Sequence, residues 1–553
     1  MTAMARLRHR IPVSLRQNWK LVVACGVFLA VCAGVFGSGT IRPYVTSARA
    51  ASGATVVTDL AGGKELFDPS AAHEVKLTFT DQAYEDMLSE YFKSGEKAYV
   101  EADLVIDGTT IPSVGVRLKG NSTLSGLTWK GESRQGGSGG PGGGQRPEGL
   151  PEGFQPQDGF QPPDGFELPE GAELPDGAGM PEGGAGFGGF GRASLKAEEP
   201  ENLPWLVSFD EFVEGRRYQG HSQIAVRPVS MGSATLLKES LAISMVGASG
   251  EPSQGYAYSS FTVNGRSSAP RLLVEYLDEG YAEELGDGVL YKSLATSTFS
   301  YKGEDQTAYT DDFKQVNAKG EQDLQPVIEL VKWVEQASDE EFASGLAARL
   351  DVESFARYLA LQNMLLNFDD MAGPGRNYYL WYDLSGKKFK VINWDLNLAF
   401  SGDAGAGPDD ALSMGGFGRQ RPEGQAGQQS EGQAGQQPEG QAGQQPEGQA
   451  GQQPEGQADQ RPGGGGMRMG HALKDRFLET AAFKEVYQEQ YRKLYQDLLA
   501  SGKAETLLDQ AVASYQANQG ADAAEAQQEA TTLRTTLATR AEALGEAFAE
   551  QGS

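Results

Sequence analysis

The chain has 553 residues, with 47 Lys and Arg against 75 Asp and Glu, so its formal net charge at pH 7 is −28. A chain this acidic repels nucleic acid and anionic lipid outside any locally basic segment, so we expect no nucleic-acid partner. The length allows one large two-lobed domain with accessory segments.

The N-terminus carries a basic segment followed by an apolar one. Residues 1–20 contain no acid, and residues 21–36 are apolar or small throughout. Because basic residues stay on the cytoplasmic side of a membrane, we expect a basic cytoplasmic segment at 1–20, a signal anchor or transmembrane helix at 21–41 and a linker at 42–72. The protein would then sit in the cell membrane, single-pass, with an extracytoplasmic C-terminal domain. Ala48-Arg49-Ala50 resembles a signal-peptidase site, so secretion after signal cleavage is the alternative.

Several common chemistries lack their sequence signature. Both cysteines, Cys25 and Cys32, lie in the apolar segment, so the exported part cannot use a disulfide framework. The four histidines are far apart and show no zinc spacing, and no G-x-x-x-x-G-K-[ST] motif is present. Paired carboxylates could also serve a glycosidase, but nothing in the sequence fixes their separation.

The first folded segment is expected at residues 73–130. Its hydrophobic pattern predicts a strand at 73–80, a helix at 81–92 with Asp81 as its cap, and a hairpin at 99–119 that turns at Asp107-Gly108. Gly120-Asn121-Ser122 then ends a strand with exposed backbone amides. Such a turn can cradle phosphate oxygens. A hairpin exit without any ligand is the alternative interpretation.

Two tracts interrupt the folded part. Residues 131–191 are rich in Gly, Pro and Glu, and residues 408–466 repeat units such as QPEGQAGQ. Neither tract buries enough apolar surface to offset the entropy of ordering the chain. We therefore expect two disordered insertions, with the remainder of the main domain at 192–407 between them.

The rest of the chain predicts a mixture of strands and helices, which indicates the α+β class. In 192–407 we expect strands within 202–220 and at 224–228, a helix at 231–246, a hairpin that begins at 261–263, and amphipathic helices at 323–337 and 351–367. The C-terminal part, 467–553, predicts three helices, at 471–499, 504–518 and 521–551. They carry few candidate catalytic groups and either complete the C-terminal lobe or form a small bundle.

Acidic and amide side chains flank a predicted hairpin with strands at 378–382 and 389–393. Asp369 precedes this hairpin, Asn377 stands at its entrance, and Asp395 follows its second strand. Hard divalent cations take oxygen ligands and are often held by one or two carboxylates plus substrate phosphates. The three residues therefore predict a metal site. Taken singly, each Asp could instead be a turn residue or a helix cap.

Three stretches carry a family pattern in a fixed order. They are Gly115-Val116-Arg117-Leu118-Lys119-Gly120-Asn121-Ser122, then LVEYLD at 273–278 with VLYK at 289–292, and finally N-x-D before NYYLWYD with K-F-x-x-I-x-W-D-L-N. This pattern resembles the spore-coat protein H (CotH) kinase-like family, which is similar to atypical protein kinases. The resemblance covers about residues 74–400.

The resemblance implies a two-lobed atypical protein-kinase-like fold and an exported or membrane-anchored ATP-dependent protein kinase. Such an enzyme would use ATP with Mg2+ or Mn2+ to phosphorylate Ser or Thr of a protein at the cell surface. Asp369, Asn377 and Asp395 would be its catalytic residues and metal ligands.

A second set of residues is expected to bind the nucleotide: Lys119, Asn121, Ser122, Glu239, Lys292 and Phe389. Glu239 is the candidate for the glutamate that pairs with a phosphate-binding lysine. Family members usually carry that lysine where this chain has Ser208, so Lys119 and Lys292 are the remaining candidates.

The alternative hypothesis is a catalytically inert CotH-like surface scaffold, an adhesion or display protein. Export to a compartment normally poor in ATP favours the scaffold, whereas the intact Asp, Asn and Asp set favours the kinase. The substrate, the oligomeric state and the source of nucleotide are not encoded in any motif of this sequence.

Overall fold

The computed structural model describes residues 58–120, 123–134, 195–228, 233–410, 412 and 470–551. The expected signal anchor, the residues Asn121 and Ser122, and most of both insertions lie outside these residues. Within the described part, no helix combines the length and the apolar character needed to span a bilayer.

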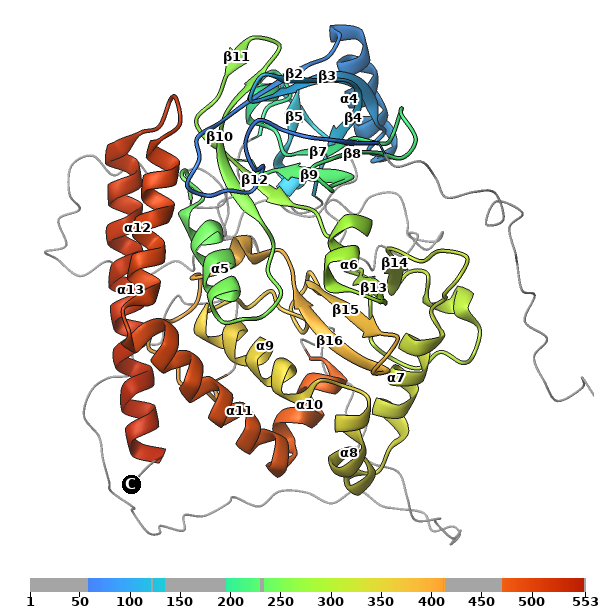
Figure 1. Cartoon of the computed structure of the whole chain (residues 1–553), viewed down its shortest axis with the longest axis vertical. Helices are drawn as coiled ribbons and strands as arrows, with labels where there is room; N and C mark the ends of the chain where they lie inside the picture. Colours follow the sequence, from blue (N-terminus) through green and yellow to red (C-terminus); the bar gives the residue numbers. More distant parts are fainter. Residues whose placement is uncertain are drawn as a thin grey trace, which may run out of the picture. The chain divides into compact units, whose positions relative to one another are not determined.

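A barrel forms the N-terminal half of the described chain (Figure 1). Its sheet has eight strands in the order β11-β10-β12-β9-β7-β4-β3-β2, and a parallel pairing between β10 and β2 closes it. The bounds are β2 (His73–Thr78), β3 (Val100–Ile106), β4 (Thr109–Leu118), β7 (Trp205–Ser208), β9 (Gln223–Val226), β10 (Tyr256–Val263), β11 (Arg266–Ser267) and β12 (Arg271–Glu275). Alternate residues of a strand point to opposite faces, and those that point inward, such as Val75, Leu104 and Val116, fill the barrel.

Smaller elements surround the barrel. They are β1 (Thr58–Leu60), which pairs in parallel with β8 (Arg216–Tyr218), the short pair β5 (Thr128–Trp129) and β6 (Glu132–Ser133), and the helix α4 (Asp81–Ser94). The strand β1 lies inside the segment expected to be a linker. The cap of α4 also differs from the prediction, because Thr80 is the N-cap and accepts a hydrogen bond from the Ala83 amide, while Asp81 is the first helical residue.

A second sheet, in the order β14-β13-β15-β16, forms the C-terminal half together with several helices. Its strands are β13 (Gly288–Ser293), β14 (Phe313–Gln315), β15 (Tyr378–Asp383) and β16 (Lys388–Asn393). The predicted hairpin is confirmed as β15 and β16, whose register pairs Tyr378 with Asn393. The neighbouring helices are α6 (Glu279–Leu285), α7 (Gln325–Gln336), α8 (Asp339–Gly345) and α9 (Val352–Met364). The predicted α+β class is therefore confirmed.

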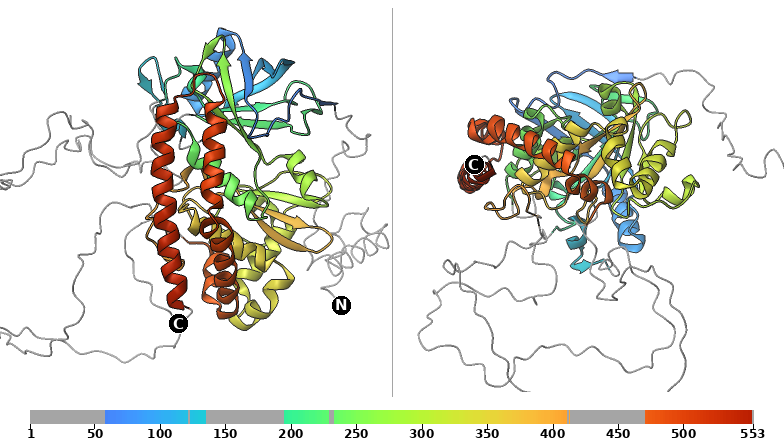
Figure 2. Two further views of the ribbon diagram at one scale, coloured as in Figure 1. Left: turned by 60° about the vertical axis from the view of Figure 1, so that its left-hand side comes forward. Right: turned by 90° about the horizontal axis from the view of Figure 1, so that it is seen from below.

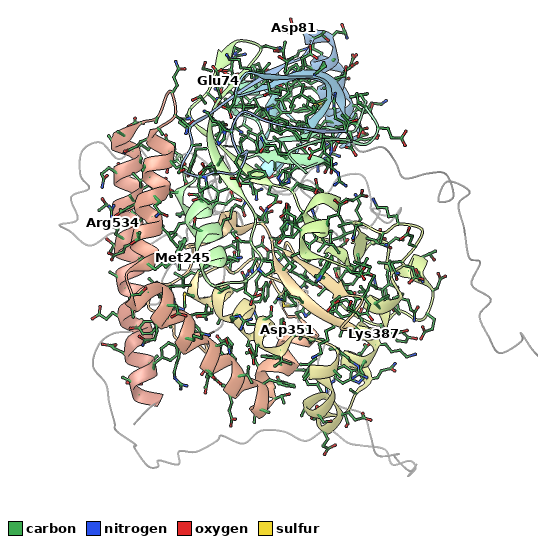
Figure 3. The ribbon with its side chains drawn as sticks, in the orientation of Figure 1. Glu74, Asp81, Met245, Asp351, Lys387 and Arg534 are labelled. Atoms are coloured by element: carbon green, nitrogen blue, oxygen red, sulfur yellow. The ribbon has the colours of Figure 1, made fainter. Side chains whose placement is uncertain are left out.

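Helices at the C-terminus pack along α5 (Leu237–Ala248) and α9 (Figure 2). They are α10 (Ala472–Glu479), α11 (Ala481–Leu494), α12 (Lys503–Gln516) and α13 (Ala523–Gln551). Met245 on α5 is buried in the same core, whereas Arg534 on α13 forms an exposed ion pair with Asp509 (Figure 3). Glu529 of α13 accepts hydrogen bonds from Ser233 and from Thr235, which fixes the loop before α5.

The remaining helical elements are short. The 3-10 helices are η1 (Thr123–Gly126), η2 (Pro200–Asn202), η3 (Gln306–Tyr309), η4 (Leu346–Ala348) and η5 (Leu396–Leu398), and a π-helix, η6 (Tyr495–Ala500), follows α11.

Two predicted helices have different boundaries. The helix expected at 231–246 begins at Leu237, because Leu236 adopts a left-handed conformation with φ of 59° that cannot continue a helix. The helix expected at 471–499 is divided at Thr480, whose extended backbone separates α10 from α11. Neither break falls at a glycine or a proline, so the sequence pattern does not reveal them.

Candidate active site

The two predicted acids, Asp369 and Asp395, line one small cavity. Asp369 lies in the loop after α9, and Asp395 follows β16 directly. The cavity has a volume of about 60 Å³ and is also lined by Lys119, Arg227 and Asn397. That volume is enough for a metal ion or a few waters, since a cavity needs only about 10–15 Å³ of such volume to hold one water. The hairpin and the α9 loop thus bring together carboxylates that are distant in sequence.

Asp395 does not behave as an ordinary helix cap. It occupies the N-cap position of η5 in a left-handed conformation, with φ of 56°, but its side chain makes no capping hydrogen bond. A non-glycine residue in this region of backbone space costs free energy, and it persists there only where the surroundings hold it. The carboxylate instead accepts a hydrogen bond of 2.6 Å from Nη2 of Arg227. The backbone therefore turns this acid into the cavity.

Arg227 forms the centre of a buried ion cluster. It follows β9, and its Nη2 atom lies 2.5 Å from the Glu239 carboxylate on α5 as well as 2.6 Å from Asp395. Burial disfavours a charged guanidinium, but Asp395 and Glu239 together hold the pKa of Arg227 above its ordinary value. The partner of Glu239 is thus an arginine and not one of the expected lysines.

Lys119 adds a second cation from the barrel. It follows β4, and its Nζ atom lies 5.4 Å from the ring centroid of Trp394. Burial and the neighbouring charge of Arg227 lower the pKa of Lys119 to about 7, against the opposing effect of Asp395. A lysine with this pKa gains its full charge readily when an anion binds beside it.

The surroundings shift the pKa values of the two acids in opposite directions. Burial, together with the charges of Asp395 and Asp370, raises the pKa of Asp369 to about 6. Burial acts on Asp395 in the same direction, but Arg227 and Lys119 overcome it and lower the pKa of Asp395. Asp395 is therefore a firmly ionised carboxylate, whereas Asp369 is poised to exchange a proton near neutral pH.

Asn377 positions Asp369. Its Nδ2 atom donates hydrogen bonds to the Asp369 carboxylate at 2.9 Å and to the Asp369 carbonyl at 3.1 Å. The Gly375 amide donates to the other carboxylate oxygen at 2.6 Å. Added Cβ atoms at Gly373 and Gly375 would both lie within 3 Å of Asp369 atoms, so this loop needs glycine to pack around the acid. The adjacent Asp370 instead pairs with Lys474 of α10.

Lys292 lies in an aromatic cage beside the cavity. Its Nζ atom is 4.7 Å from the ring centroid of Trp394, 5.3 Å from that of Tyr276 and 5.5 Å from that of Tyr379. It also donates a hydrogen bond of 3.4 Å to the Tyr276 hydroxyl. Burial would raise the pKa of Tyr276, but the charge of Lys292 holds it below its ordinary value. The Trp394 ring thus lies close to both candidate lysines, Lys119 and Lys292.

The remaining expected contacts lie elsewhere. Phe389 is near the start of β16, at the far end of that strand from Asp395, where its ring contacts that of Tyr382 at the hydrophobic core. This position does not match the expected nucleotide contact. Asn121 and Ser122 lie outside the described residues, next to Gly120, which lines the cavity.

Sequence reasoning missed Arg227 and Asn397. The first stands alone after a strand, 168 residues before its partner Asp395, so no local spacing links them. The second was visible as part of W-D-L-N but was not assigned a role. Among the described residues, no group of three or more His, Cys, Asp or Glu could hold a metal ion. The donor set that the cavity offers is two carboxylates and the Asn397 amide, which suits Mg2+ when substrate phosphates supply the other ligands.

The site thus combines paired carboxylates with buried cations, which is the composition of a site for phosphate chemistry. The family model for the CotH kinase protein matches residues 194–544, well over half of the chain. The chain belongs to the CotH kinase family. The match includes α10 to α12 and most of α13, so the C-terminal helices belong to the family region. No curated protein matches the chain.

Proposed function

We propose that this protein is a CotH-type protein kinase that transfers phosphate from ATP, with Mg2+, to Ser or Thr of a surface protein. The observation that carries this proposal is the shared cavity, in which Asp369 and Asp395 face Lys119 and Arg227. Carboxylates there suit a metal ion, and cations suit the phosphates of a nucleotide. Family membership supports the same reaction class.

Asp395 and Asn397 are the residues proposed to hold Mg2+, with Asp369 as a further ligand or as the proton acceptor. When bound, the metal neutralises charge on the β- and γ-phosphate oxygens. Asp395 suits the first role because it stays ionised, and the short hydrogen bond from Arg227 fixes its direction.

Asp369 is proposed to accept the proton of the substrate hydroxyl. In the transfer, the hydroxyl oxygen forms a bond to the γ-phosphorus while the bond from that phosphorus to the β–γ bridging oxygen breaks. The proton moves to the Asp369 carboxylate, and ADP leaves with the electron pair of the broken bond. A base with a pKa of about 6 is mostly ionised at pH 7 and can still hold the proton briefly.

Lys119 and Arg227 are proposed to contact the phosphates. Glu239 fixes the guanidinium of Arg227, as the glutamate of a kinase helix fixes a lysine in related sites. Lys292 is held by aromatic rings beside the cavity, and its proposed role is to position Trp394, whose ring also lies 5.4 Å from Nζ of Lys119.

One observation favours the alternative, an inert scaffold. Arg227 occupies the carboxylates of both Glu239 and Asp395, so the phosphate-binding lysine of the family pattern has no glutamate partner here. A scaffold would keep this ion cluster for stability alone and would bind no nucleotide.

Under either hypothesis we propose that residues 21–41 anchor the chain in the cell membrane. A reporter fused to the C-terminus tests this proposal, because it should be active only outside the cytoplasm.

Nucleotide binding by the purified full chain separates the two hypotheses. Isothermal titration with ATP should give saturable binding in Mg2+, and excess EDTA should weaken it at least about tenfold, because Asp395 and Asn397 would hold a metal ion that offsets the charge of the phosphates. Arg534→Gln on α13 is the control variant and should bind as the parent does. Absence of binding, or binding of equal strength in EDTA, would favour the scaffold.

A further inference from the structure

A second, smaller cavity shares walls with the cavity of the proposed transfer site. Its volume is about 30 Å³, which is room for about two water-sized groups, such as two oxygens of a phosphoryl group. The residues that line both cavities are Thr123, Arg227, Pro228 and Asn397. The rest of the lining comes from α5 and from the loop before it. One elongated ligand can therefore reach both cavities.

The N-terminus of α5 lies at this second cavity without a side-chain cap from the residues before it. Its N-cap residue is Leu236, which lines the cavity and has no atom that can accept a hydrogen bond. Ser233 and Thr235 are of types that commonly cap helices, but both hydroxyls donate to Glu529 of α13 instead. The first amides of α5 therefore receive no acceptor from these side chains. An open N-terminus of a helix of 12 residues attracts anions.

Arg227 brings a buried donor to the same cavity. The residue is 7% exposed and lines both cavities, and its Nε atom is buried without a hydrogen-bond partner among the described residues. Its Nη2 atom is already engaged by Glu239 and Asp395. Buried donors without a partner are rare in native proteins, and a bound ligand that supplies the acceptor explains this one.

Lys238 supplies a second cation. It is the second residue of α5, is half-buried and lines the cavity. Within the described part of the chain, Lys238 has no ion-pair partner. Two acids lie close by, but Glu239 pairs with Arg227 at 2.5 Å, and Glu529 accepts the two hydroxyls before α5. The lining thus carries two cations against one paired carboxylate, and the helix N-terminus adds to the positive side.

We infer that the second cavity is a phosphate subsite, so that the protein binds a polyphosphate chain with one phosphate group at the start of α5 and the next beside Asp395. Lys238 and the first amides of α5 hold the former group, and Arg227 lies between the two. The inference deepens the proposed function, because ATP carries such a chain, and it rests on that function only for the identity of the nucleotide. The subsite selects diphosphates and triphosphates over monophosphates, because a single phosphate group cannot occupy both cavities.

Isothermal titration of the full chain with inorganic phosphates tests this inference without a nucleoside. In Mg2+, tripolyphosphate and pyrophosphate should bind at least about tenfold more tightly than orthophosphate, because the second group binds as part of the same molecule. Equal affinity for the three anions, or no binding of any of them, would overturn the inference.

Variants of Lys238 locate the subsite. Lys238→Gln should weaken binding of tripolyphosphate about tenfold or more, because it removes a charged hydrogen-bond donor, whereas Lys238→Arg should bind nearly as the parent does. Lys503→Gln is the matched control, since Lys503 begins α12, another helix with a left-handed N-cap and no side-chain cap, and does not line the cavity. Circular dichroism checks that each variant is folded. Equal loss in the control or in Lys238→Arg, or no loss in Lys238→Gln, would contradict the placement.

A failure of the subsite and a failure of the kinase proposal give different results. If ATP transfers no phosphate but tripolyphosphate binds in a manner that depends on Lys238, the kinase proposal fails and the subsite stands. If Lys238→Gln binds tripolyphosphate and ATP as tightly as the parent and still transfers phosphate, the subsite is overturned and the kinase proposal stands.

Discussion

The barrel and the second sheet contribute opposite charges to the site. Lys119 and Arg227 come from ends of barrel strands, whereas Asp369 and Asp395 come from the α9 loop and from the end of β16. Neither half contains a complete site, because the cations alone would repel one another and the acids alone would hold their protons. The chemistry therefore depends on how the two halves of the domain meet.

Loss of the arginine on the barrel side should have the largest effect on stability. Arg227→Met leaves Glu239 and Asp395 with no guanidinium partner, and breaking a buried ion cluster in this way costs about 3–5 kcal/mol. Urea unfolding monitored by circular dichroism measures this loss. Arg534→Met, which breaks the exposed pair with Asp509, is the control and should cost less than about 1 kcal/mol. Similar costs for the two variants would show that the buried cluster adds nothing to the fold.

A buried histidine in the C-terminal half should make the free energy of unfolding depend on pH. Burial lowers the pKa of His471 to about 3 from an ordinary value of 6.5, and the ring packs between Phe299 and Tyr378. Below pH 6.5 this histidine binds a proton in the unfolded state but not in the folded state. The free energy of unfolding therefore falls by about 1.4 kcal/mol for each unit that the pH is lowered from 6.5 toward 3. In urea titrations at several pH values, His471→Gln should lose this part of the slope. A slope equal to that of the parent would refute the assignment.

Removal of repeats should have the smallest effect. Deletion of residues 428–460 takes away only polar and Gly-rich sequence, and closure of a shorter loop changes the free energy of unfolding by less than about 1 kcal/mol. Hydrogen bonds from Asn363 to the Asp410 carbonyl and from Arg376 to the Gly470 carbonyl hold the two flanks in the parent. A scanning calorimetry trace should therefore be nearly unchanged, and a large decrease in melting temperature would show that the repeats pack on the domain.

Local sequence signals predicted the hairpin and its acids but not their partners. Alternating apolar residues and a Ser-Gly turn define β15 and β16, and an acid after a strand is visible without any structure. Arg227 was beyond such reasoning, because it contacts Asp395 across 168 residues of sequence. The pairing of β10 with β2 that closes the barrel could not be predicted either, since no residue pattern in one strand identifies the other as its partner. Pairing across a fold depends on tertiary packing and not on periodicity.

We propose that Asp395 serves a metal ion and not the backbone, and one substitution tests this role most directly. Asp395→Asn keeps the volume of the side chain and a hydrogen-bond acceptor for Arg227, but it removes the charge that would face the cation. Transfer of labelled phosphate from ATP should then fall by about 10³-fold or more, while the near-UV circular dichroism spectrum stays that of the parent. Asp383→Asn, in the turn of the same hairpin, should transfer phosphate normally, because Asn accepts the Ser385 amide equally well. Full activity of Asp395→Asn, or loss of activity only together with the folded spectrum, would contradict the claim.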